Sequence, residues 1–502
     1  MPVIRGEDLP GDTTITVDAC VIGTGAGGAP VAKELAEGGM TVAILEEGEW
    51  QDTATFTARP REMTGRLYRD AGQIVTIGTP PIVLPLGKAV GGTTLVNSGT
   101  CFRTPDHVLA RWRSDLGLEQ LTPDALAPFF ARVEHEIHVS QVTPELAGEN
   151  ADVVRRGAEA LGYSGDYLHR NAKGCVGSGV CAFGCPTGAK QHTGASYMPK
   201  ATAAGATTYT GTHAEHVSIA GGRAREVVAR TTAGGRLRVR CTYAIVACGA
   251  LLTPVFLARQ GIRHPQLGEN LTIHPAAAAR ALLDHDIDPW RGVPQSYYVD
   301  ELAHDGIMLE GISGPPDQQA AATPGSGAVH RERMLNLRRT ATFGVMVSDS
   351  ASGSVHRRLG QTLIRYDLAD RDAERFRRGF ELLAEIFFAA GAREVLVPID
   401  GEILLRDGDL TPLRTHRTRP QHISAMAFHP LGTARMGADA RQAVVDADLQ
   451  VHGVEGLYVC DGSVVPSSLG VNPQITIMAL ATRLAFNLTG RPAPRTAPFE
   501  TA

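Results

Sequence analysis

The chain has 502 residues, 43% of them hydrophobic and 20% charged, and its formal net charge at pH 7 is −5. No block of basic residues stands out, which argues against nucleic acid or an anionic membrane as the main partner. No stretch approaches the roughly 18 uninterrupted apolar residues of a membrane span, and no secretory signal is visible. Eight cysteines do not make a disulfide framework in a chain of this length. We therefore expect a cytoplasmic α/β protein of two interleaved domains.

The first elements form a β-α-β unit around a glycine-rich loop. The patterns predict a buried strand at 14–22, a helix at 30–37 with Pro30 in its first turn, and a second strand at 40–45. An acid follows the glycines at a distance of about 20 residues, which is typical of a dinucleotide site. In such a site the helix N-terminus faces the pyrophosphate. The candidate residues are Gly23, Gly25, Ala26, Gly27, Gly28, Glu46 and Glu47.

The two acids after the second strand have different expected roles. Glu46 ends the strand, where an acid typically holds a ribose hydroxyl. The neighbouring Glu47 fits a solvated loop carboxylate better, although it stays among the candidates.

The nucleotide-binding sheet is predicted to be discontinuous in sequence. An apolar strand at 241–249 ends on Gly249 and precedes a helix at 251–260, and a late strand ends on Asp461 and Gly462. The expected fold class is therefore α/β combined with α+β, with a Rossmann-type domain and an inserted substrate-binding cap of antiparallel sheet and helices. The Rossmann-type domain is assigned 1–101, 206–275 and 425–502, and the cap is assigned 102–205 and 276–424.

Three further segments have clear patterns. Asn472 and Pro473 precede an apolar run at 475–488, and asparagine as N-cap with proline at the first helical position are good start signals. The segment 372–390 carries phenylalanines on one face, as expected of an amphipathic helix packed on a core. The segment 314–329, rich in proline, glycine and alanine, is expected to be a mobile loop.

Several motifs follow one another in an order and spacing typical of one enzyme family. They are Gly23 to Gly28, Glu46, Val90 to Asn97, Gly249 to Pro254, Gly268 to Leu271, His274-Pro275, His429 to Gly437, Asp461-Gly462 and Gly470 to Pro473. In these segments, which span nearly the whole length, the chain resembles the glucose-methanol-choline (GMC) oxidoreductases, the FAD-dependent family that includes choline and cholesterol oxidases.

The resemblance implies that the chain binds FAD. Gly91 and Gly92 would approach the isoalloxazine ring, with Thr93 and Asn97 nearby. In some relatives a histidine just before this asparagine is bonded to the flavin. Here that position is Val96, which has no nucleophile, so we expect FAD to be held non-covalently.

Further contacts with FAD are implied by segments later in the chain. Asp461 and Gly462 match the segment that lies against the pyrophosphate and ribityl chain, and Gly249 belongs to another of the family's motifs. Val217, in a strand expected at 212–219, matches the position whose backbone meets the adenine.

The resemblance also implies a catalytic pair, His429 and Asn472. In alcohol oxidation the hydroxyl proton must leave as hydride passes to flavin N5, and a histidine suits that base role. Asn472 would hold the alcohol oxygen over N5, and the helix that begins at Pro473 would stabilise negative charge on the reduced ring. The expected partners are a small-molecule alcohol and dioxygen or another electron acceptor. No targeting signal is visible, and a cytoplasmic enzyme that releases peroxide as a main product would be a burden to its cell. We therefore favour a dehydrogenase with an organic or protein acceptor.

Three cysteines, Cys175, Cys181 and Cys185, lie close together in the expected cap. With Pro186 they fit the ferredoxin spacing C-x2-C-x2-C-x3-C-P, but the second ligand position is Ser178. Three thiolates suffice for a three-iron cluster, and a zinc site is a weaker alternative. We favour cysteines packed as small apolar side chains, and therefore no metal.

Two alternative functions remain open on the same scaffold. One is a non-redox lyase of the hydroxynitrile-lyase type, in which FAD is a structural element. The other is an iron-sulfur-assisted electron-relay flavoprotein. The presence of both His429 and Asn472 favours alcohol oxidation over an electron carrier.

Overall fold

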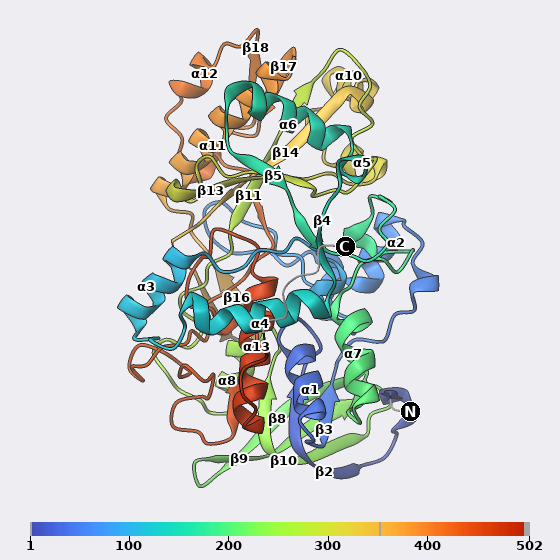
Figure 1. Ribbon diagram of the computed structural model, residues 1–502, viewed down its shortest axis with the longest axis vertical. Coiled ribbons are helices and arrows are strands. Elements are labelled where there is room, and N and C mark those ends of the chain that lie inside the picture. The colour runs from blue at the N-terminus through green and yellow to red at the C-terminus, as the bar shows by residue number, and fades with distance from the viewer. Residues whose placement is uncertain (1–2, 351–352, 496–502) are drawn as a thin grey trace.

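The computed structural model describes residues 3–350 and 353–495. Two sheets lie toward opposite ends of the long axis, and helices cover each of them (Figure 1). No helix in the described part of the chain is long and apolar enough to cross a membrane.

The first sheet joins eight strands of the described residues, and most of its pairs are parallel. Its order is β1 (Val3–Arg5), β7 (Thr207–Thr210), β3 (Val42–Leu45), β2 (Thr13–Ile22), β10 (Arg236–Val246), β9 (Arg223–Thr231) and β8 (Thr212–Ala220), with β20 (Leu457–Val459) paired to β10. Only β9 pairs antiparallel, with β10 on one side and β8 on the other. This is the parallel core expected of a Rossmann-type domain.

The parallel register aligns the ends of three strands that are far apart in sequence. Ile22 of β2 pairs with Val246 of β10, and Val246 pairs in turn with Val459 of β20. The loops that follow these strands therefore begin side by side at one edge of the sheet, where ligands of open parallel sheets bind.

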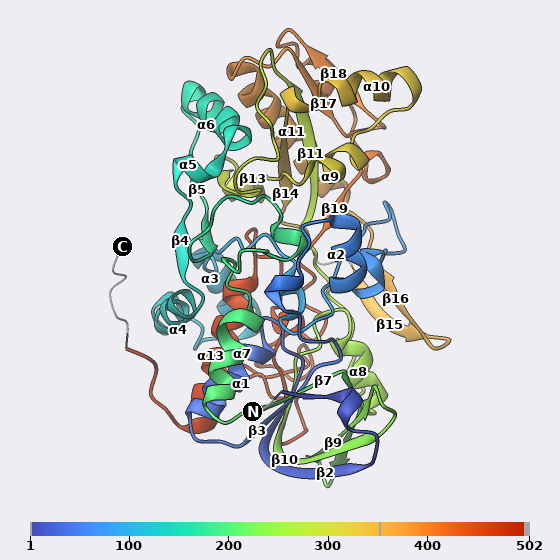
Figure 2. The same ribbon diagram turned by 90° about the vertical axis from the view of Figure 1, so that its right-hand side faces the viewer.

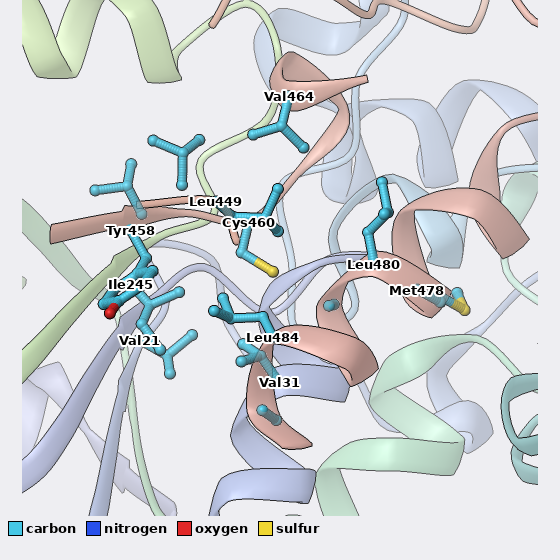
Figure 3. Close-up of a cluster of buried hydrophobic side chains, with 14 of the residues drawn as sticks. Val21, Val31, Ile245, Leu449, Tyr458, Cys460, Val464, Met478, Leu480 and Leu484 are labelled. Atoms are coloured by element: carbon cyan, nitrogen blue, oxygen red, sulfur yellow. The ribbon is translucent and has the colours of Figure 1, made fainter. Parts of the chain in front are cut away.

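Helices α1 (Gly28–Glu37) and α13 (Gln474–Thr489) bury their apolar faces against this sheet. Figure 3 shows Val31 of α1 and Leu484 of α13 beside Val21 and Ile245 of the sheet, and all four side chains are buried. The first and last helices thus share one core. Helices α7 (Thr193–Ala203) and α4 (Pro123–Glu136) pack outside them (Figure 2).

The second sheet is antiparallel throughout its described pairs. Its order is β18 (Ile403–Arg406), β17 (Glu394–Val397), β11 (Pro275–Leu282), β14 (Thr340–Val347), β13 (Ile307–Gly311), β12 (Tyr297–Val299) and β5 (Gly165–Tyr167), with β19 (Met426–Ala427) paired to β11. Helix α11 (Asp370–Ala389) packs on it through Phe376, Phe380 and Phe387, as the amphipathic pattern predicts.

The remaining elements connect or flank the two sheets. The helices are α2 (Pro60–Leu67), α3 (Asp106–Leu116), α5 (Pro144–Ala147), α6 (Glu149–Leu161), α8 (Thr253–Arg259), α9 (Pro316–Ala321), α10 (Gly327–Leu335) and α12 (Thr411–Arg414). Two small sheets pair β15 (Ser354–Arg358) with β16 (Gln361–Arg365), and β4 (Val139–Gln141) with β6 (His169–Asn171).

Two sequence expectations need correction here. The segment 314–329 is not a loop throughout, because α9 and the start of α10 lie in it. Pro316 occupies the first turn of α9, where a missing N–H does no harm, so proline here starts a helix and does not break one. The second correction concerns the domain boundaries. Strand β19 lies beyond residue 425 yet pairs with β11 of the second sheet, and α4 and α7, which lie within 102–205, pack on α13 and α1 of the first core.

Candidate active site

The glycine loop after β2 lies where three chain segments meet too closely for side chains. A Cβ on Gly27 would lie 1.6 Å from the carbonyl oxygen of Cys460, and one on Gly23 would lie 2.4 Å from that of Ala247. Gly23 also has a φ of 105°, which favours glycine. These two positions therefore need glycine because β2, β10 and β20 end side by side.

Gly25 differs, because its hypothetical Cβ would meet no heavy atom of the described residues within 4 Å. The second glycine segment borders the same space: Gly91 N–H donates to Thr24 Oγ1 at 2.9 Å, and a Cβ on Gly92 would lie 3.0 Å from Gly25 Cα. Ala26 is partly exposed in this loop, and Gly28 is the first residue of α1. The open space before a helix N-terminus suits a pyrophosphate, so the residues present fit a dinucleotide.

Glu46, at the end of β3, ties the glycine loop to the next strand. Its Oε2 accepts hydrogen bonds from Thr24 N–H at 3.0 Å and Thr24 Oγ1 at 2.6 Å, and its Oε1 accepts from Gly48 N–H at 2.8 Å. Burial raises the pKa of this carboxyl, and the three hydrogen bonds oppose the rise. Glu46 therefore orders the loop with its own carboxylate.

The expectation of a solvated Glu47 is wrong. Its carboxylate forms an ion pair with Arg69 and lies 3.9 Å from Lys88 Nζ, and the side chain is only 23% exposed. The sequence pattern does not indicate that Arg69 lies next to Glu47.

Asp461 joins the ends of β20 and β10. Its Oδ2 accepts hydrogen bonds from Gly249 N–H at 2.9 Å and from the Thr253 hydroxyl, while its Oδ1 accepts from Ser463 N–H at 2.8 Å. Gly462 begins the 3-10 turn that follows. The two segments predicted to meet the cofactor thus lie together, beside the glycine loop.

The backbone N–H of Val217 has a partner outside the glycine loop and the Asp461–Gly462 segment. Its N–H donates to Gln260 Oε1 at 2.9 Å, and its side chain is buried in the core. The start of β8 is closer, since Thr212 N–H donates to the Glu46 carbonyl at 2.8 Å. A β-bulge between Ala214 and His216 shifts the strand's register, which a pattern of residue types does not reveal.

The proposed catalytic side chains meet although they come from separate loops. His429 Nε2 lies 3.3 Å from Asn472 Nδ2. His429 is partly exposed, but surrounding protein atoms desolvate its ring and lower its pKa to about 4. Its ring also packs edge-on against His274, with centroids 5.2 Å apart. Burial holds the pKa of His274 well below its usual value, so both rings are neutral near pH 7.

Asn472 is not the helix N-cap that the sequence suggests. Helix α13 begins at Gln474, with Pro473 in the cap position and no side-chain capping bond. The Asn472 amide instead contacts His429 and Glu310, so its hydrogen-bonding groups serve the site and not the helix.

Asn97 reaches the same helix start from the other glycine segment. Its Nδ2 donates to Gln474 Oε1 at 3.0 Å, whereas Thr93 Oγ1 accepts from Gly87 N–H at 3.2 Å. The Oδ1 atoms of Asn97 and Asn472 are both buried and have no hydrogen-bond partner among residues 3–350 and 353–495. Unsatisfied acceptors at this junction suit a bound group that carries N–H or O–H donors.

Glu310, in β13 of the second sheet, is a site residue that the sequence analysis missed. Its Oε2 accepts hydrogen bonds from Asn472 Nδ2 at 3.4 Å and from Gln295 Nε2 at 2.8 Å. Burial raises its pKa to about 7. One signal could have found it: Glu310 is the only charged residue in the buried strand Ile307–Gly311.

The three cysteines of the cap segment contact other groups. Cys181 Sγ accepts from Arg170 Nη2 at 3.2 Å, and Cys185 Sγ lies 3.3 Å from Thr187 Oγ1. In residues 3–350 and 353–495, no group of three or more His, Cys, Asp or Glu side chains is placed to hold a metal ion.

Comparisons with known proteins agree with this architecture. Two models of GMC oxidoreductase domains match residues 64–276 and 351–481. An uncharacterized GMC-type oxidoreductase of Mycobacterium tuberculosis is 41% identical over 488 residues, covering 97% of this chain and 77% of the relative. The long-chain-alcohol oxidase FAO4B of Arabidopsis thaliana is 28% identical over 509 residues, covering 93% of this chain and 66% of the oxidase.

The fold also matches a solved structure, a variant of the formate oxidase of Aspergillus oryzae RIB40 that concerns FAD modification. The TM-score is 0.75 at 16% identity, with 96% of this chain and 98% of that chain covered. GMC oxidoreductases bind FAD. Because the two domain models and the mycobacterial relative together span nearly all of the sequence, the chain belongs to the GMC oxidoreductase family.

Proposed function

We propose that the protein oxidises an alcohol (CH–OH) group of a small organic substrate to a carbonyl. The observation that carries this proposal is the 3.3 Å contact between His429 Nε2 and Asn472 Nδ2, two groups that can serve one alcohol oxygen. The relative described as a long-chain-alcohol oxidase supports the substrate class.

FAD would be held by the glycine loop at Gly23–Gly28, by Gly91 and Gly92, and by the Asp461–Gly462 segment. When bound, FAD supplies the acceptor for the hydride that leaves the alcohol carbon. The binding is non-covalent in this proposal, because Val96 offers no nucleophile. Denaturing the yellow protein should release all of its flavin, and colour retained by the precipitated chain would contradict this.

His429 takes the alcohol proton. Its low pKa keeps the imidazole unprotonated at neutral pH, so a lone pair is available without prior deprotonation. When the alcohol is bound, the Asn472 N–H that otherwise faces His429 Nε2 donates to the alcohol oxygen and stabilises the negative charge that develops there. Proton and hydride together account for both hydrogens removed from the CH–OH group.

The test is an anaerobic screen of alcohols that follows the visible absorption of the flavin. Bleaching by an alcohol, with the matching carbonyl as product, is the expected result. Cleavage of a cyanohydrin with no bleaching by any alcohol would identify a lyase and overturn the proposal.

For the electron acceptor we propose an organic molecule or a protein. Stopped-flow mixing of the reduced enzyme with air-saturated buffer distinguishes this from oxidase activity. Re-oxidation much slower than turnover with artificial acceptors is expected, and re-oxidation as fast as turnover would make dioxygen the acceptor.

A further inference from the structure

Glu310 is a buried carboxyl whose hydrogen-bond partners are both amides. Asn472 Nδ2 and Gln295 Nε2 donate to the same oxygen, Oε2, while Oε1 has no hydrogen-bond partner in the described part of the chain. Within the described ranges, no arginine, lysine or histidine forms an ion pair with it. A buried, unneutralised carboxyl is unfavourable for stability, which makes a purely structural role unattractive.

The two amides are held in one orientation by what faces them. An ionised carboxylate only accepts hydrogen bonds, so Gln295 and Asn472 must both turn their NH2 groups toward Glu310. The Thr100 hydroxyl donates to Gln295 Oε1 at 2.6 Å, which agrees with this orientation of Gln295.

The orientation of Asn472 determines the state of His429. An NH2 group carries two hydrogens, and the one not given to Glu310 faces His429 Nε2 at 3.3 Å. A ring nitrogen that faces an N–H donor must carry the lone pair, so the proton of the neutral ring sits on Nδ1. Nε2 is then the basic atom.

We infer that Glu310 is a positioning residue: its carboxylate fixes the Asn472 amide, and the fixed amide selects the His429 tautomer whose Nε2 accepts the substrate proton. This inference rests on the proposed function. Glu310 itself need not touch the substrate, because it acts through Asn472.

The inference makes activity depend on the protonation of Glu310. A protonated carboxyl can donate to Asn472 Oδ1, and an amide turned that way would present oxygen to His429 Nε2 and favour the wrong tautomer. The partners of Glu310, Gln295 and Asn472, are neutral, and no charged side chain of the described residues shifts the pKa of the carboxyl. The titratable rings next to Asn472, His429 and His274, stay neutral because burial lowers the pKa of both. Activity should therefore fall as pH drops through about 7, the pKa of Glu310.

The test compares anaerobic flavin reduction by one alcohol, between about pH 5 and about pH 9, in the FAD-loaded wild type and two variants. Glu310→Gln keeps an acceptor for Asn472 at every pH, so the fall near pH 7 should disappear. Its rate at high pH should stay within about tenfold of wild type. Glu310→Leu has no acceptor, and its rate should be about 10- to 100-fold lower at every pH, the size of one lost charge-assisted hydrogen bond.

A matched control is Asp349→Asn. Asp349 is another buried carboxyl of raised pKa, about 6, but it accepts from Tyr366 and from the N–H groups of Ile273 and His274. Its variant should keep the fall near pH 7. Flavin absorption and circular dichroism establish that each variant is folded. If Glu310→Leu does not fold, the pH profile of the nearly isosteric Glu310→Gln is sufficient to test the inference.

A wild-type pH profile in Glu310→Gln, or loss of the fall in Asp349→Asn alone, would overturn the inference. Failure of the proposed function looks different, because then no alcohol would reduce the wild-type flavin at any pH.

Discussion

The nucleotide side and the cap side of the site are built by different means. On the nucleotide side the site is formed mainly by the backbone. Gly23 and Gly27 let three strand ends converge, and backbone N–H groups donate hydrogen bonds to Glu46 and Asp461. On the cap side, Glu310 and Gln295 act through side chains supplied by the second sheet and the loop before it. Where backbone segments touch, a glycine cannot be replaced by a larger residue. A network of side chains is instead sensitive to changes in charge and orientation.

A pair of glycine variants tests this difference between the two sides most directly. Gly27→Ala places a Cβ on the Cys460 carbonyl oxygen, so the unfolding free energy should drop by more than about 3 kcal/mol and FAD binding should be lost. The Cβ of Gly25→Ala meets no atom of residues 3–350 and 353–495 within 4 Å, so stability without FAD should change by less than about 0.5 kcal/mol while FAD affinity falls. Urea unfolding and FAD titration measure both, and equal effects in the two variants would contradict the account.

The catalytic pair, which stands between the two sides, should affect rate without affecting cofactor binding. His429→Ala and Asn472→Ala should each slow flavin reduction by about 10²- to 10⁴-fold, because a base or the donor to the developing charge is lost. FAD content and flavin absorption should stay at the wild-type level. The exposed His285→Ala serves as the control and should react normally. Wild-type reduction rates in the His429 variant would remove His429 from the mechanism.

Ionisation of Glu310 on the cap side should make the unfolding free energy depend on pH. Burial raises the pKa of Glu310 from 4.5 to about 7, so the folded state binds this proton more tightly than the unfolded chain. The resulting stability is fully present below pH 4.5 and is lost as pH rises through about 7.

Glu310→Gln cannot ionise and escapes that loss. The unfolding free energy of its FAD-free form should therefore exceed that of wild type by up to about 3 kcal/mol at pH 8, with almost no difference near pH 4. Chemical denaturation at the two pH values measures this. A variant less stable than wild type at pH 8 would show that the ionised carboxyl is stabilising.

The smallest effect is expected in the cysteine segment. Serine at Cys175, Cys181 and Cys185 together should leave the visible spectrum and the rate of flavin reduction unchanged, with fewer than about one iron per chain in the wild type. Acid-labile sulfide with roughly three irons per chain would contradict this and identify an electron-relay enzyme.

The same contrast explains what the sequence could predict. The β-α-β unit, the resumption of the sheet at β10 and the helix at 372–390 follow from local patterns, and the structure has all three. Glycine at 23 and 27 is readable because it belongs to a recurrent spacing between a strand and a helix, although the atoms that exclude a larger residue come from distant Ala247 and Cys460. Glu310 and Gln295 carry no such mark, since their role depends on contacts between residues far apart in the chain. The pairing of Glu47 with Arg69 was missed for the same reason.

The shared core of the first and last helices has a consequence for how the chain is made. On the ribosome, β2 and α1 emerge early, yet β20 and α13, which complete their sheet and cover α1, emerge only after residue 456. Until then residues 244–246 of β10 lack their β20 partner, and the side of α1 that packs on α13 stays uncovered. Such surfaces invite aggregation in slowly folding proteins. Synthesis stalled before β20 would therefore leave an aggregation-prone intermediate. The amount of folded protein in the cell should depend on chaperones that shield the nascent N-terminal half.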